Sequence, residues 1–268
     1  MTNVFVSVDQ VETPARFIDV RFNLMDKNEG RTQYEKEHIA GAVYVDLERD
    51  LSDMSKKDGR HPMPDKAQLI DVFESVGLQL TDRIYVYDQG GAPFAPRAWW
   101  MLKYAGFENV AIVNGGYDAL KKAGYATTSN KESFDRSTIV ANWQEDMYAD
   151  RDYVKAITEG KVEAMLLDAR AAIRYRGEQE PLDPVAGHIP TAKNFDWEQV
   201  KDGNQLVVTE TLRNAVASHK EVVVYCGSGV TASPLYTVLK EAGHENVKLY
   251  VGSYSDWITK YEVATGEE

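Results

Sequence analysis

Short runs rich in β-branched and aromatic residues alternate along the chain with segments whose apolar positions have helical spacing. Strands that alternate with helices typically build parallel sheets whose faces are covered by those helices. The pattern therefore predicts an α/β fold with mostly parallel sheets. The predicted strands are Phe17–Val20, Ala42–Val45, Ile84–Tyr87, Val110–Val113, Met165–Asp168, Val222–Tyr225 and Val247–Tyr250.

The two halves of the chain are similar in sequence. The Asp-x-Arg motif of residues 19–21 recurs at residues 168–170, and the Ala-Gly-x-Glu-Asn-Val run of residues 105–110 recurs at 242–247. The offset between matching positions is 149 in the first case and 137 in the second. The first half therefore contains about a dozen extra residues, which we place in the polar segment from Asp50 to Pro64.

Two homologous domains in tandem explain this repeat, because solenoid repeats are only about 20–50 residues long. The first predicted domain covers residues 10–128 and the second residues 148–268. The boundary is expected near residues 128 to 147, where the polar run from Thr127 to Ser133 has the composition of a linker. Each domain is predicted to be a mostly parallel sheet flanked by helices.

The composition is that of a globular protein and excludes several classes of partner. Of the 268 residues, 43% are hydrophobic and 27% charged, and the net charge is −12. This charge repels nucleic acid and anionic lipid, so neither is an expected partner. No apolar run approaches the length of a bilayer span, and the opening residues 1–6 lack the pattern of a leader. A cytoplasmic location is expected.

The chain contains one cysteine, Cys226. A single cysteine excludes an internal disulfide, a four-cysteine zinc site and a CxxC redox pair. Covalent chemistry at this thiol must therefore be completed by an outside molecule. The sequence gives no sign of a metal site or an organic cofactor.

The halves differ at the strand that precedes Cys226. After Tyr87 the first half has Asp88, whereas after Tyr225 the second half has the loop that begins with Cys226. Cys226 is thus predicted to lie between the strand ending at Tyr225 and a helix over residues 232–242, where α/β proteins bind ligands. A buried, inert cysteine is the alternative, but a glycine-rich loop before a helix favours a reactive one.

Gly227 and Gly229 allow the loop to curl so that successive backbone N–H groups point at one sulfur. Such donors and the helix N-terminus stabilise a thiolate or a persulfide anion. Features that occur in both halves are expected to serve the fold, namely the two Asp-x-Arg motifs, His38 and His188. By contrast, the second half alone has an arginine, Arg174, where the first has Met25.

With these motifs the chain resembles the tandem rhodanese-domain family over nearly its whole length. The resemblance implies an inactive first domain and a catalytic second domain. The loop Cys226-Gly227-Ser228-Gly229-Val230-Thr231 is similar to that of the 3-mercaptopyruvate sulfurtransferase branch, whereas thiosulfate-using members tend to have basic residues in this loop. The resemblance further implies that Cys226 takes sulfur from a small anionic donor, 3-mercaptopyruvate, with release of pyruvate. The sulfur then passes to cyanide or to a thiol such as thioredoxin.

The resemblance also implies roles for other residues. Arg174 is expected to bind the substrate carboxylate, with Gly227, Gly229, Val230 and Thr231 of the loop around it. The family's second arginine, nine residues later, is replaced by Asp183, so Arg176 is the expected substitute.

The run Gly59–Pro64 is similar to the family's loop that reaches the active site. His61, Ser228 and Glu48 are expected to form a polar relay for proton transfer. The family usually has Asp where Glu48 stands, and the alignment also allows Asp46. Arg97 is expected either to line the cleft between the domains or to form a structural ion pair.

Three other functions remain open. A thiosulfate:cyanide sulfurtransferase would use the same cysteine with arginines outside the loop. A cysteine phosphatase is disfavoured, because its Cys-x5-Arg loop needs an arginine where Ala232 stands. A rhodanese-like module that binds without catalysis would show no persulfide on Cys226.

Overall fold

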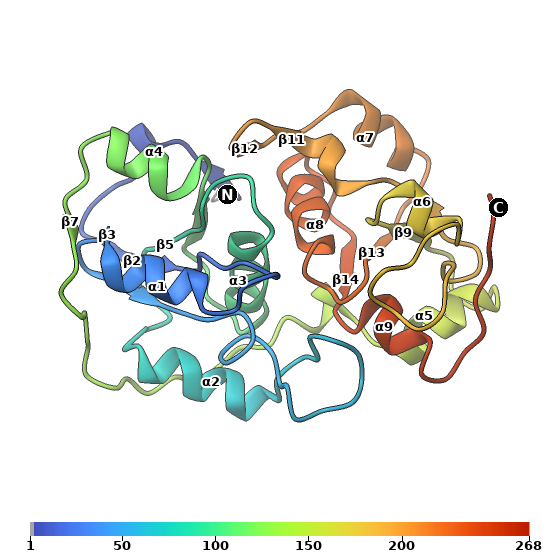
Figure 1. The fold of residues 1–268 in the computed structure, drawn as a ribbon, viewed down its shortest axis with the longest axis horizontal. Coiled ribbons are helices and arrows are strands. Elements are labelled where there is room, and N and C mark those ends of the chain that lie inside the picture. Colours follow the sequence, from blue (N-terminus) through green and yellow to red (C-terminus); the bar gives the residue numbers. More distant parts are fainter. Residues whose placement is uncertain (1–2, 268) are drawn as a thin grey trace. The chain divides into compact units, whose positions relative to one another are not determined.

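The computed structural model describes residues 3–267, and the chain divides into two compact units (Figure 1). Met1 and Thr2 of the opening segment, and Glu268, lie outside the described residues. The first unit contains the chain up to residue 53, residues 64–144 and residues 202–206. The second contains residues 54–63, 145–201 and the chain from residue 207. Most of the predicted insertion, residues 54–63, thus belongs to the second unit.

The first unit is built on a five-stranded sheet whose strands pair in parallel, in the order β1-β6-β5-β2-β4. Its strands are β1 (Phe5–Val6), β2 (Arg16–Asp19), β4 (Ala42–Tyr44), β5 (Ile84–Tyr87) and β6 (Val110–Val113), with β3 (His38–Ile39) and β7 (Thr127–Thr128) forming a separate antiparallel pair. Its helices are η1 (Val8–Gln10), α1 (Glu29–Lys36), α2 (Lys66–Ser75), α3 (Phe94–Tyr104) and α4 (Gly116–Lys122).

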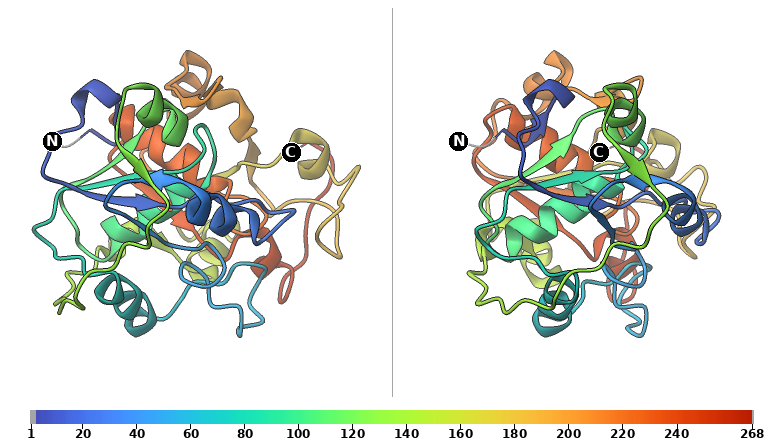
Figure 2. Two further views of the ribbon diagram at one scale, coloured as in Figure 1. Left: turned by 60° about the vertical axis from the view of Figure 1, so that its left-hand side comes forward. Right: turned by 90° about the vertical axis from the view of Figure 1, so that its left-hand side faces the viewer.

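The second unit repeats this topology with the order β8-β14-β13-β9-β10. Figure 1 labels its three central strands, β9, β13 and β14, and Figure 2 shows the ribbon in two further views. Its strands are β8 (Tyr148–Ala149), β9 (Met165–Asp168), β10 (Lys193–Asn194), β13 (Val222–Tyr225) and β14 (Val247–Tyr250). A separate pair, β11 (Lys201–Asp202) with β12 (Gln205–Leu206), belongs to the first unit from residue 202 onward. Its helices are η2 (Glu145–Met147), α5 (Arg151–Thr158), α6 (Ala172–Tyr175), η3 (Trp197–Val200), α7 (Glu210–Val216), α8 (Ala232–Glu241) and α9 (Ser253–Trp257).

The predicted α/β class with parallel sheets is confirmed, and the seven predicted strands are present. Five have the predicted bounds, β4 ends one residue earlier than predicted, and β2 both begins and ends one residue earlier. The remaining strands of the two sheets, β1, β8 and β10, are two residues long. Strands this short carry no periodic pattern, which is why the sequence did not predict them. None of the helices within residues 3–267 is long and apolar enough to cross a membrane.

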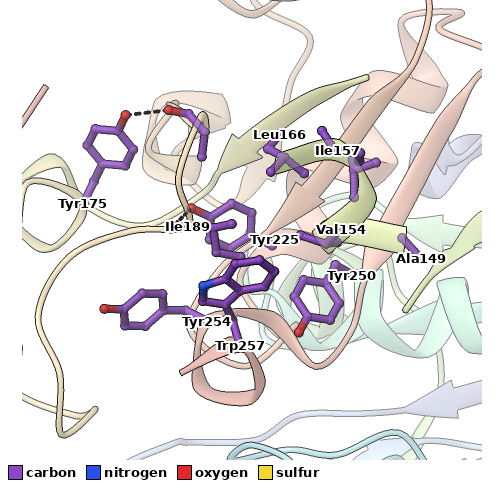
Figure 3. Packing of buried hydrophobic residues seen from close by; sticks show 12 residues of the cluster. Ala149, Val154, Ile157, Leu166, Tyr175, Ile189, Tyr225, Tyr250, Tyr254 and Trp257 are labelled. Atoms are coloured by element: carbon purple, nitrogen blue, oxygen red, sulfur yellow. Dashed lines mark hydrogen bonds between the residues drawn. The ribbon is translucent and has the colours of Figure 1, made fainter. Parts of the chain in front are cut away.

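The central strand of the second unit, β13, is buried along its whole length. Parallel strands covered on both faces read as continuous apolar runs, and Val222–Tyr225 has this composition. Figure 3 shows Tyr225 beside Trp257 and Tyr254, which α9 contributes to the same core cluster. The Trp257 indole N–H donates to Glu262 O at 2.9 Å, which fixes the ring. The strand that ends at Cys226 therefore rests on a packed core.

The motifs common to both halves make the same contacts in each unit. The guanidinium of Arg21 pairs with Asp19 at 2.6 Å, and that of Arg170 pairs with Asp168 at 2.6 Å. His38 and His188 each stack on a tyrosine of their own unit, with ring centroids 3.8 Å apart in both cases. Because the contacts occur with and without a nearby cysteine, they maintain the fold.

Candidate functional site

Cys226 follows β13 directly and opens a six-residue loop that leads into α8. Its side chain is buried, and the Gly229 N–H donates a hydrogen bond to Sγ at 3.1 Å. Gly229 has a φ of 74°, which residues with a Cβ rarely adopt. The loop conformation thus depends on this glycine and directs a backbone donor at the sulfur.

The carbonyl groups of the loop are bound by groups outside it. The N–H of Tyr254 donates to Cys226 O at 3.0 Å, and the N–H of Ser255 donates to Gly227 O at 2.9 Å. Ser233 holds the carbonyls of the two residues that follow Ser228, donating to Gly229 O from its hydroxyl at 3.0 Å and to Val230 O from its N–H at 3.1 Å. With these carbonyls engaged, the loop is suited to stabilise an anionic sulfur through its N–H groups.

Ser253, which the sequence analysis did not single out, holds the first residue of the loop. Its Oγ accepts the Cys226 N–H at 3.1 Å, and its hydroxyl donates to Tyr250 O at 2.8 Å. Its φ is 58°, whereas the matching residue of the first unit is Gly116, with a φ of 64°. The signal in the sequence is that a serine stands where the first half has Gly116. A non-glycine residue at a position suited to glycine often has a specific role.

His61 and Ser228 lie together in the second unit. His61 Nδ1 and Ser228 Oγ are 2.8 Å apart, and both side chains are buried. His61 belongs to the segment 54–63, which folds with the second unit. The segment thus brings an imidazole to the residue two positions after Cys226.

Arg174 lies in α6 within a cluster of charged side chains. Its guanidinium binds Glu180 through Nε at 3.1 Å and NH2 at 2.8 Å, and NH2 also reaches Asp183 at 3.3 Å. Asp183 in turn accepts two bonds from Arg60, at 2.9 Å from Nε and 3.2 Å from NH2. The side chains of Asp183 and Glu180 are 1% and 3% exposed. Buried carboxylates of this kind need such cationic partners.

Arg60 is the second functional candidate that the sequence analysis missed. A Cβ built on Gly227 would lie 2.2 Å from Arg60 NH2 and 3.4 Å from Arg174 NH2. A side chain at position 227 would therefore displace the Arg60 guanidinium, and the glycine leaves the space that this group occupies. Arg60 belongs to the run Gly59–Pro64. The signal in the sequence for a basic partner was Asp183, an acidic residue at the position of the family's second arginine.

The other predicted substrate residues of the second unit are placed as follows. Arg176 is turned toward acidic residues, with Nε 2.7 Å from Glu178 and NH1 3.7 Å from Glu267. Val230 is buried, and Thr231 immediately precedes the first residue of α8. The structure therefore brings Cys226, Gly227, Ser228 and Gly229 together with His61 and Arg174, while Arg176 is paired with Glu178 and Glu267.

Two predicted residues belong to the first unit. Glu48 pairs with Lys27 at 2.8 Å, and the alternative, Asp46, accepts the backbone N–H of Glu48 at 3.0 Å. Arg97 is fully buried in α3 and donates from NH2 to Leu51 O at 3.1 Å. Its bond to a backbone carbonyl ties the segment before residue 54 to the helix.

In the first unit, Asp88 occupies the position that corresponds to Cys226. Its carboxylate accepts the N–H groups of Gly90 at 2.8 Å and Ala95 at 2.9 Å. Burial raises the pKa of Asp88 to about 6, although backbone hydrogen bonds oppose the rise. In this unit the loop N–H groups are thus occupied by a carboxyl group of the chain itself.

Comparison with known proteins identifies two matching segments. The model of the family described as "Rhodanese-like domain" matches residues 8–123 and again residues 150–260. The second segment contains Cys226 and its loop, and the first contains Asp88.

Relatives that resemble the chain over nearly its full length carry sulfurtransferase names. One from Pseudomonas aeruginosa, 40% identical over 93% of this chain and 92% of its own, is named for 3-mercaptopyruvate. One from Mycobacterium tuberculosis, 36% identical over 92% of this chain and 89% of its own, is named for thiosulfate. A solved 3-mercaptopyruvate sulfurtransferase from Leishmania major superposes with a TM-score of 0.82 at 26% identity, covering 97% of this chain and 75% of that one.

Proposed function

The chain belongs to the rhodanese family, with two rhodanese-like domains in tandem, and we propose that it transfers sulfur from 3-mercaptopyruvate through a persulfide on Cys226. Its enzyme class is sulfurtransferase, as for the relatives named above. The observation that carries the proposal is the placement of Cys226: its Sγ accepts a hydrogen bond from the Gly229 N–H. The next residue, Gly227, lies beside the guanidinium groups of Arg60 and Arg174.

In the first half-reaction the Cys226 thiolate attacks the sulfur of 3-mercaptopyruvate. The new S–S bond forms as the C–S bond breaks, and the electron pair of that bond passes to the carbon, where the neighbouring ketone delocalises it. The proton of the donor's thiol ends on this carbon, so pyruvate leaves and the persulfide keeps the negative charge. Backbone N–H donors stabilise that charge without having to reorganise during the reaction.

Arg174 supports the choice of donor because it binds a carboxylate well. A planar guanidinium forms two parallel hydrogen bonds with a carboxylate. Arg174 NH2 lies 3.4 Å from the position of a Cβ on Gly227, one residue beyond the nucleophile. A carboxylate held there would place the donor's sulfur close to Cys226, and fixed orientation of this kind accelerates bimolecular steps.

His61 and Ser228 can move the proton that the donor's thiol loses. His61 Nδ1 lies 2.8 Å from the Oγ of Ser228, which belongs to the loop of Cys226, and an imidazole can both accept and donate a proton. The remaining member of the expected relay, Glu48, belongs to the first unit. Proton transfer at the site is therefore proposed for His61 and Ser228.

In the second half-reaction an acceptor attacks the outer sulfur of the persulfide. A thiolate, such as that of thioredoxin, becomes a persulfide and Cys226 returns as a thiolate; cyanide becomes thiocyanate in the same way. Because the chain has a single cysteine, it cannot resolve its own persulfide as a disulfide. The acceptor must come from another molecule.

Thiosulfate as donor is the second candidate, favoured by the relative named for it. Thiosulfate carries two negative charges, so it needs an excess of basic groups. The loop from Cys226 to Thr231 contains none, and both Arg60 and Arg174 are paired with carboxylates. These pairs favour the singly charged carboxylate donor.

Intact mass after incubation with either donor tests the proposal. Wild type should gain one sulfur atom from 3-mercaptopyruvate with release of one equivalent of pyruvate, and Cys226→Ser should gain none. Loading from thiosulfate alone would transfer the assignment to the second candidate. No loading of wild type from either donor would favour a rhodanese-like binding module.

A further inference from the structure

A single buried carboxylate holds two arginines that come from distant parts of the sequence. Asp183 binds Arg60 through both oxygens, at 2.9 and 3.2 Å, and Arg174 through Oδ2 at 3.3 Å. Its side chain is 1% exposed. Asp183 is therefore shared by both guanidinium groups, and their positions depend on it.

Each guanidinium keeps one nitrogen for another ligand. Arg60 uses Nε and NH2 for Asp183, and Arg174 uses Nε and NH2 for Glu180 and Asp183. In the described part of the chain, the NH1 group of neither arginine has a hydrogen-bond partner. Both side chains are partly exposed, at 31% for Arg60 and 17% for Arg174. Two N–H-rich groups beside Gly227 are thus accessible to an anion.

The charges of this cluster balance before a substrate binds. Arg170 also contacts Glu180, at 3.3 Å, and pairs with Asp168. The three arginines, Arg60, Arg170 and Arg174, are therefore matched by three carboxylates, Asp168, Glu180 and Asp183. Burial opposes ionisation of Glu180, but hydrogen bonds from Arg174 and from backbone N–H groups outweigh it, and the pKa of Glu180 is lowered. A monoanion therefore adds one uncompensated charge and a dianion adds two. Replacing Asp183 by a neutral residue would leave the cluster positive by one.

We propose that Arg60 and Arg174 form a two-arginine clamp for the carboxylate of a singly charged donor, and that Asp183 is the residue that positions the clamp and disfavours a doubly charged donor. The inference rests on the proposed function and adds to it the selectivity between sulfur donors. It assigns the second carboxylate-binding position to Arg60, from the segment 54–63, in place of Arg176. Arg176 is held by Glu178 and Glu267 instead.

Steady-state kinetics with both donors, with cyanide as acceptor and thiocyanate as product, tests the clamp. Arg60→Ala should raise KM for 3-mercaptopyruvate by about tenfold or more, the loss expected for one charge-assisted hydrogen bond. Arg60→Lys should recover part of this loss, because lysine restores the positive charge but cannot form the two parallel hydrogen bonds of a guanidinium. Transfer from the preformed persulfide to cyanide should stay at the wild-type rate, since the donor has already left.

The donor preference tests Asp183. Asp183→Asn should lower the ratio of kcat/KM for 3-mercaptopyruvate to kcat/KM for thiosulfate by at least about tenfold. Glu178→Gln is the matched control, because it removes an exposed negative charge five positions away in sequence, and it should leave the ratio unchanged. A purely structural role for Asp183 would reduce both values together and leave their ratio intact, which would overturn the inference.

The two hypotheses fail in different ways. Wild type that accepts no sulfur from 3-mercaptopyruvate would contradict the proposed function itself. Wild type that is loaded, together with an Arg60→Ala variant of unchanged KM, would contradict the clamp alone. Arg60→Ala and Arg60→Lys keep Asp183, so they decide the question even where Asp183→Asn fails to fold. Arg136→Ala, which removes an exposed ion-paired arginine of the first unit, controls for the loss of one positive charge.

Discussion

His61 Nδ1 lies 2.8 Å from the Oγ of Ser228, although 167 positions separate the two residues in the sequence. The contact exists because residues 54–63 fold with the second unit. Both side chains are buried, so the hydrogen bond is shielded from competition with water. The pair is therefore well placed for the proton transfer that we propose beside Cys226.

His61→Gln should lower kcat with 3-mercaptopyruvate by about a hundredfold, the usual contribution of a positioned acid or base. Glutamine can still hydrogen-bond to Ser228 but cannot exchange a proton near neutral pH. The melting temperature should stay close to that of wild type, which separates lost proton transfer from lost structure. A variant with wild-type kcat would exclude His61 from the proton path.

Gly227→Ala should raise KM for the donor by about tenfold while the protein stays folded. The new methyl group would stand 2.2 Å from Arg60 NH2, and the flexible arginine must move aside. Combining Gly227→Ala with Arg60→Ala gives the decisive comparison. The two losses should fail to add, because the glycine acts through the arginine; additive losses would assign Gly227 another role.

The sequence was sufficient for the seven longer strands of the two sheets, because Val222–Tyr225 and its counterparts are apolar and bounded by polar residues. It was not sufficient for the two-residue strands. It also located Cys226 at the end of a strand. Its periodicity could not reveal that residues 54–63 fold with the second unit, because their partners, Asp183, Ser228 and Ser255, lie far along the chain. Only the family resemblance implied that Gly59–Pro64 reaches the site. Pairings of this kind follow from tertiary structure, which periodicity does not encode.

Ser253 allows backbone strain and hydrogen bonding to be separated. Its φ of 58° is unfavourable for a side chain, whereas its Oγ accepts the Cys226 N–H. Ser253→Ala should lower the unfolding free energy by about 1–3 kcal/mol, because it leaves the Cys226 N–H without its acceptor and does not relieve the backbone strain. Ser253→Gly, the residue found at position 116, should lower it less. Urea unfolding of both variants checks the order, and equal losses would contradict it.

The duplicated ion pairs allow each unit to be destabilised by itself. Arg170→Ala would leave the carboxylate of Asp168 buried without its cation, and Arg21→Ala would do the same to Asp19. Each change should destabilise its own unit by about 3–5 kcal/mol. Hydrogen exchange resolved by peptide checks this, since protection should fall in the second unit for Arg170→Ala and in the first for Arg21→Ala. Loss of protection in the wrong unit would contradict a local structural role.

Asp88 should make the stability of the first unit depend on pH. Its pKa is raised to about 6 by burial, from an ordinary value of 3.8. Because the folded state keeps the proton to higher pH than the unfolded chain, the stabilising contribution is complete below pH 3.8 and is lost as the pH rises through about 6. The shift corresponds to about 3 kcal/mol, since one pKa unit is worth about 1.4 kcal/mol.

Asp88→Asn removes this titration and provides the measurement. The unfolding free energy of the variant minus that of wild type should increase by about 2 kcal/mol between pH 4 and pH 7, since part of the effect is already lost at pH 4. Asp118→Asn, at an exposed carboxylate of the same unit, is the control for the loss of one negative charge. A difference that stays constant with pH would mean that the carboxyl group of Asp88 is ionised throughout this range. The loop N–H groups of the first unit would then stabilise an anion as fully as the loop of Cys226 is proposed to do.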